Sequence, residues 1–199
     1  DTGSCFPEQH YMVDISNKTS EIFGMIEQGD YFVINRPRQY GKTTMLSMLN
    51  KLLKSSKEYF SIKLSFEGLG QTRFESEKSF INAFFRLFRK EFKASGNEEM
   101  LKYIELGSIP EYFDILDEWL SELIKKTGKK VVLMIDEVDK SSNNQLFLDF
   151  LGMLRNKYLE RHEPGQFTFY SVILAGVHNV KNLRLKMGLN ADPKYNSPW

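Results

Sequence analysis

The stretch "YFVINRPRQYGKTTML", residues 31–46, determines the fold class. It opens with a short β-rich run, continues through a loop that ends in Gly41-Lys42-Thr43, and then takes on a helical pattern with apolar residues on one side. The three residues match the second half of the phosphate-binding pattern G-x-x-x-x-G-K-[ST], while Arg36 stands where the first glycine is expected. A strand, a loop and a helix in this order are the context that such a loop requires.

Backbone N–H groups around the glycine and at the helix N-terminus can point together at one anion, and the helix dipole favours negative charge there. We therefore predict that Lys42 reaches the β- and γ-phosphates, Thr43 completes the shell of a Mg²⁺ ion and Thr44 contacts the α-phosphate. Arg36 in place of glycine costs about 1 kcal/mol if the loop needs a positive φ, but it removes no phosphate ligand. The predicted nucleotide-binding residues are Arg36, Pro37, Arg38, Gln39, Tyr40, Gly41, Lys42, Thr43 and Thr44.

A second motif, "VLMIDE" at 132–137, follows later in the chain. Its apolar run predicts a buried strand of a parallel sheet, and ligands of open α/β sheets bind at the carboxyl ends of such strands. We expect Asp136 to hold Mg²⁺ and Glu137 to polarise the attacking water, which makes Glu137 and Lys42 the candidate catalytic residues. The alternative is that Lys42 only starts one helix and that the two acids only cap another. Two motifs in the right order on the right elements argue against it.

The remaining pattern indicates an α/β protein. Alternation over 59–66 predicts an outer, half-exposed strand, and "FTFYSVILAG" predicts a further strand at 167–176. Helical segments are expected at 16–28, 42–53, 74–93, 108–126 and 143–160, the fourth opened by a capping box from Ser108 to Glu111. This order favours a three-layer sandwich with a mostly parallel sheet. Neither an internal repeat nor a linker divides residues 1–199, so we expect a single domain.

Composition sets limits on partners and compartment. The 199 residues carry 27 Lys and Arg against 26 Asp and Glu, so the net charge of +1 gives no broad footprint for nucleic acid or anionic membrane, and such a partner needs a local patch. Cys5 is the only cysteine, and no apolar run approaches the length of a membrane span. We expect a cytoplasmic protein without a membrane partner.

Several further segments join the two motifs in a family resemblance: "YMVDIS", "VVLMIDEVDKSSN", "FLDFLGMLR", "SVILAGVHNVKNL" and "YNSPW". From about His10 to Trp199 the chain resembles the AAA-ATPase-like family of bacterial P-loop proteins, whose members often carry a PD-(D/E)XK nuclease-like domain after the ATPase. The resemblance implies an ASCE-type P-loop fold with strand 167–176 between the two motif strands. It also implies that Arg36 is normal, because the loop is similar to the G-P-R-R-x-G-K-T loop of archaeal and STAND-type ATPases.

These observations predict Mg²⁺-dependent ATP binding and hydrolysis by a domain that acts as motor or switch for an attached domain. The alternative is a nucleotide-responsive scaffold that binds ATP with little turnover. We expect slow hydrolysis by the chain alone, the absence of a downstream lid and nuclease-like domain, self-association as one route to activation, and contact with nucleic acid only through the attached domain. No nuclease motif is convincing within the chain.

The sensor and the arginine finger stay open. His178 and Asn179 are sensor candidates, with a solvated turn as an equal alternative, and Asp139 is better explained as a helix cap than as support for the acidic pair. Phenylalanines at helical spacing between 80 and 88 indicate core rather than base stacking. The arginines available as a finger are Arg38, Arg155, Arg161 and Arg184.

Overall fold

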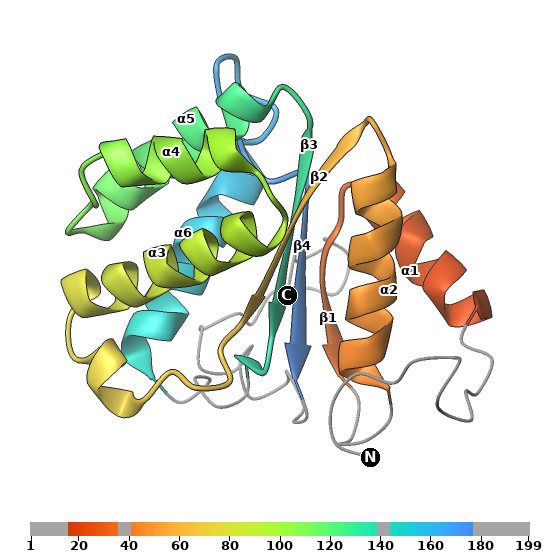
Figure 1. Ribbon diagram of the computed structural model, residues 1–199, viewed down its shortest axis with the longest axis horizontal. Helices are drawn as coiled ribbons and strands as arrows, with labels where there is room; N and C mark the ends of the chain where they lie inside the picture. Colours follow the sequence, from red (N-terminus) through yellow and green to blue (C-terminus); the bar gives the residue numbers. More distant parts are fainter. Residues whose placement is uncertain (1–15, 36–40, 139–143, 177–199) are drawn as a thin grey trace.

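The computed structural model describes residues 16–35, 41–138 and 144–176. Within them, four parallel strands form one sheet in the order β1-β4-β3-β2 (Figure 1). The strands are β1 (Tyr31–Asn35), β2 (Tyr59–Ser65), β3 (Lys130–Asp136) and β4 (Ser171–Gly176). β4 therefore lies between β1 and β3, the two strands that precede the motifs, as the family resemblance implied.

Helices cover both faces of the sheet and complete three layers (Figure 1). On one face lie α1 (Ser16–Glu27) and α2 (Lys42–Ser55). The other face carries the 3₁₀ turn η1 (Gln71–Phe74) and the helices α3 (Glu77–Ala94), α4 (Glu98–Leu106), α5 (Phe113–Thr127) and α6 (Gln145–Glu160). The α/β fold with a parallel sheet is thus confirmed.

The central position of β3 explains its unbroken apolar sequence. Val132 and Met134 enter the core beneath α1 and α2, whereas Val131, Leu133 and Ile135 enter the core beneath the other helices. Both faces are covered, and both edges pair with a neighbouring strand, so no polar position is tolerated until the strand ends. The phenylalanines of α3 belong to the same larger core, which confirms the packing interpretation of that stripe.

Four details differ from the sequence expectations. The capping box was wrong: α5 begins at Phe113, whose backbone N–H donates to Glu77 Oε2 at 2.7 Å, so a carboxylate from α3 takes the place of a local cap. α4 was missed. β4 starts at Ser171, later than predicted, after Tyr170 N donates to Val131 O at 2.8 Å. β2 is an edge strand of the described sheet, as predicted, but it is not half-exposed, because α2 covers its polar face and buries Ser61.

The fold brings the two motifs to one edge. All four strands run in the same direction and end at the edge where α2 begins (Figure 1). Among the described residues, no helix combines the length and the apolar character that crossing a bilayer requires.

Candidate nucleotide-binding site

The start of α2 forms one side of the site. Gly41 is its N-cap and adopts a left-handed conformation, φ 69° and ψ 17°, which favours glycine. The first hydrogen bond of the helix runs from Met45 N to Gly41 O at 2.8 Å, and the N–H groups in the first turn of a helix are the ones that a bound anion can use. Together with the helix dipole, these donors create a site for an anion.

The end of β3 forms the other side. Asp136 is the last residue of the strand and is only 2% exposed, while Glu137 follows with φ 59°. Among the described residues other than glycine, Glu137 alone has a positive φ. Such a conformation is strained and is found disproportionately at functional sites. The backbone N–H of Glu137 donates to Asp136 Oδ1 at 2.9 Å, which orients the Asp136 carboxylate.

The two sides are in direct contact. The Thr43 hydroxyl donates to Asp136 Oδ2 at 2.9 Å. The Lys42 ammonium lies 3.3 Å from Glu137 Oε1 and 3.5 Å from Asp136 Oδ1. Lys42 is itself 6% exposed, so its charge is compensated by these carboxylates in a largely dry environment. Four predicted site residues from two motifs that are far apart in the chain therefore converge; Thr44 is buried one position further along α2.

Lys63 and Ser47 extend this contact, and sequence reasoning missed both. Lys63 Nζ donates to Ser47 Oγ at 2.7 Å, and Ser47 Oγ donates to Thr43 O at 2.8 Å. Burial lowers the pKa of Lys63, and the Asp136 carboxylate acts in the opposite direction. The lysine thus adds a second positive charge near Asp136. The alternation of β2 placed Lys63 on the polar face of the strand but could not identify the residue of α2 above it.

The oxygen atoms of this site suit a small, hard cation that takes most of its ligands from water and phosphate rather than from the protein. Thr43 and Asp136 contribute a hydroxyl and a carboxylate oxygen that already approach each other, and Mg²⁺ prefers oxygen ligands and commonly takes one or two from the protein beside phosphate and water. The described part of the chain contains no cluster of three or more His, Cys, Asp or Glu residues. A metal here would depend on the nucleotide for further ligands.

Other predicted residues cannot be placed next to this site. Arg36, Pro37, Arg38, Gln39 and Tyr40 lie outside the described residues, as do Asp139, His178, Asn179 and Arg184. Arg161 is described, and it lies beyond the C-terminal end of α6, where it donates to Tyr158 O at 2.7 Å and stacks 3.6 Å above the Tyr158 ring. Arg161 lies among residues that precede the strands, so it is at the end of the sheet opposite Lys42.

Comparisons with known proteins agree with this architecture. A family model described as an AAA-like domain matches residues 7–191. No curated protein matches the chain. Among solved structures, the ORC2 protein of Aeropyrum pernix, determined as ADPNP-ADP complexes, is similar in fold, with a TM-score of 0.52 at 11% sequence identity. The similarity covers 94% of this chain and 46% of that one, so the chain spans less than half the length of the ORC2 structure.

Proposed function

Because this chain belongs to the AAA-like domain family, we propose that it binds ATP with Mg²⁺ at the Lys42–Asp136 site and hydrolyses it. The observation that carries the proposal is the convergence of the two motifs: Thr43 donates to Asp136 at 2.9 Å, and Lys42 lies beside both acids. If these residues only capped helices, a hydroxyl, an ammonium and two carboxylates would not need to be in contact. Thr43 and Asp136 make this contact although they are 93 residues apart in the sequence.

Each group of residues has a role that suits its chemistry. The N–H groups at the start of α2 bind phosphate oxygens, and Lys42 exchanges its contacts to Asp136 and Glu137 for the β- and γ-phosphates. Thr44 contacts the α-phosphate. The loop residues Arg36, Pro37, Arg38, Gln39 and Tyr40 complete the cradle, as part of the same proposal.

Thr43 and Asp136 hold the metal, with Lys63 and Ser47 keeping the start of α2 and the acid in register. When bound, Mg²⁺ neutralises charge on the phosphate oxygens. Glu137 accepts a proton from the attacking water, and its side chain is 21% exposed, so water can reach it.

The alternative is a nucleotide-responsive scaffold with little turnover. The contact between Lys42 and Glu137 favours it, because the Glu137 carboxylate cannot orient an attacking water while the ammonium occupies it. Both functions share the binding site and differ in the role of Glu137.

We also propose that nucleotide occupancy is transmitted to an attached domain, as a motor or a switch. The support is the resemblance of the sequence to P-loop ATPases that are followed by a nuclease-like domain. We propose that residues 1–199 form one domain. Adding the attached domain to the nucleotide assay tests whether the two act together.

The test combines binding and turnover. Calorimetry should detect ATP binding in Mg²⁺ and weaker binding in EDTA, and a phosphate-release assay should detect slow hydrolysis that requires Mg²⁺. Absence of ATP binding in Mg²⁺ would disprove the assignment. Binding without any phosphate release, even after the attached domain is supplied, would select the scaffold function.

A further inference from the structure

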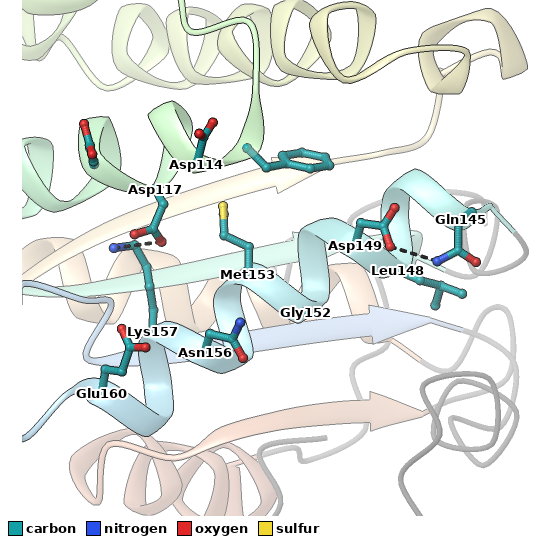
Figure 2. Close-up of a pocket in the computed structure, with 12 residues that line it drawn as sticks. Asp114, Asp117, Gln145, Leu148, Asp149, Gly152, Met153, Asn156, Lys157 and Glu160 are labelled. Atoms are coloured by element: carbon teal, nitrogen blue, oxygen red, sulfur yellow. Dashed lines mark hydrogen bonds and ion pairs between the residues drawn. The ribbon is translucent and has the colours of Figure 1, made fainter.

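Two cavities in the described surface differ in charge. The first, of about 770 Å³, is a groove between α5 and α6 (Figure 2). Its one lysine, Lys157, is buried and binds Asp117 at 3.0 Å and Ser121 at 2.6 Å. The remaining charges are carboxylates of Asp114, Glu118, Asp149 and Glu160. This acidic groove repels polyanions.

The second cavity, of about 960 Å³, lies at the amino ends of the strands and is basic. Segments that enter all four strands line it, together with the ends of α5 and α6. One carboxylate, Glu58, contributes, and it is paired with Lys130. The cations of this basic cavity are Lys57, Lys125, Lys129, Lys130 and Arg161. A local patch of this kind is what a chain with a net charge of +1 requires to bind a polyanion.

The ends of helices explain only part of this charge. Helix C-termini carry a partial negative charge, and Lys125 in the last turn of α5 complements it. Lys57 follows α2, and Lys129 lies between α5 and β3; both side chains are exposed, and neither makes an ion pair with any residue that the structure describes. Their full charges exceed the roughly half charge of a helix end and remain available to a ligand.

Aromatic rings lie among these cations. Phe167 is 37% exposed, and Lys125 Nζ approaches its ring to 5.5 Å from the centroid. Lys130 Nζ lies 4.7 Å from the centroid of the Tyr170 ring, whose hydroxyl donates to Glu27 O at 2.6 Å. Tyr170 is therefore fixed in place, and Phe167 offers the more accessible apolar surface. Cationic side chains interleaved with accessible rings are the combination that recognises unpaired bases on a phosphate backbone.

We propose that the basic cavity binds single-stranded nucleic acid, with backbone phosphates on Lys57 and Lys129 and a base stacked on Phe167. A cavity of about 960 Å³ is in the range of small-ligand sites and admits a splayed nucleotide. A duplex keeps its base faces stacked and cannot offer one to Phe167. An acidic peptide would use the cations but has no chemical need for the exposed ring.

This site is separate from the nucleotide site. Lys130 begins β3 and Asp136 ends it, so the cavity lies at the end of the sheet opposite Asp136 and Lys42. The inference does not depend on ATP hydrolysis, and either proposal can fail alone.

The experiment measures fluorescence anisotropy of a labelled 12-nucleotide oligothymidylate with the 199-residue chain over a range of salt concentrations. Lys57→Glu/Lys129→Glu should weaken binding at least tenfold and reduce the slope of log K against log salt by about 1.4, since each lost phosphate contact of a single strand accounts for about 0.7. Phe167→Ala should weaken binding about tenfold and leave that slope unchanged, because stacking releases no counterions. Lys57→Gln/Lys129→Gln removes the same two charges without adding negative ones, so it should also weaken binding. It replaces the glutamate pair if that variant does not fold.

The matched control is Lys90→Glu/Lys102→Glu, which changes two exposed lysines on α3 and α4 that do not line the cavity. Its affinity should equal that of the unmodified chain, and circular dichroism should show that each variant folds. Absence of salt-dependent binding, or equal loss in the control, would overturn the proposal. Loss of binding in Lys42→Ala would instead place the oligonucleotide on the phosphate loop. Displacement by poly-glutamate, with no effect of Phe167→Ala, would assign the cavity to an acidic protein segment.

Discussion

Lys42 has two carboxylates as neighbours, and in the proposed site it exchanges them for the phosphates of ATP. Lys42→Ala removes a charged hydrogen-bond donor to phosphate, so ATP binding should weaken by about 1.5–3 kcal/mol. Calorimetry in Mg²⁺ measures this change. Lys51→Ala, at an exposed position on the same helix, should bind ATP like the unmodified chain. Equal affinities for ATP in the Lys42→Ala variant and the unmodified chain would exclude the lysine from the site.

Glu137 tests turnover rather than binding. Glu137→Gln keeps the size and hydrogen-bonding capacity of the side chain but removes its basicity, so phosphate release should fall by about 10²-fold or more while ATP stays bound. Single-turnover phosphate release, paired with calorimetry on the same preparation, separates the two quantities. A matching loss of affinity would show that Glu137 has a different role, such as holding Lys42.

At this scale the sequence predicted the residues with a fixed position in a motif and missed the ones that depend on packing. Lys42, Thr43, Asp136 and Glu137 lie together because both motifs end at one sheet edge, which follows from parallel strands. Lys63 contacts Ser47 because α2 crosses β2 at that level. The angle and height of that crossing depend on the side chains of the whole layer, which no local pattern encodes.

Among the elements, the start of α5 depends on a residue of α3. Glu77→Ala removes the acceptor of the Phe113 N–H, which leaves a partly buried donor unpaired and should lower the free energy of unfolding by about 1–2 kcal/mol. Urea unfolding with an unchanged m-value measures the effect. Glu75→Ala, at an exposed neighbouring position, serves as the control. Equal unfolding midpoints for the two variants would show that water replaces the carboxylate at no cost.

The same contact explains where element prediction failed. Ser108 to Glu111 has the pattern of a capping box, and nothing in that pattern reveals that Glu77 already serves Phe113 from another helix. The strands were easier, because apolar runs in a sheet covered on both faces leave a strong local signal. The predicted β4 was too long because Phe169 is buried and β-prone. Phe169 nevertheless precedes Ser171, the first residue of β4 that pairs with β3.

For the whole molecule, the prediction is slow ATP turnover by the chain alone. Arg161 lies at the end of the sheet opposite Lys42, and an arginine supplied by another subunit or domain can account for about 10³–10⁵ in rate. Phosphate release per chain should therefore rise with protein concentration or on addition of the attached domain. A rate on the order of 1 s⁻¹ from a chain shown to be monomeric by light scattering would mean that the catalytic set is complete in cis.

Lys130 and Asp136 occupy the two ends of β3, which is seven residues long. At about 3.3 Å per residue, roughly 20 Å separates a cation of the basic cavity from the proposed metal ligand. The strand between them is buried and paired on both sides. If both ligands bind, reciprocity applies: any factor by which ATP changes oligonucleotide affinity must equal the factor by which the oligonucleotide changes ATP affinity.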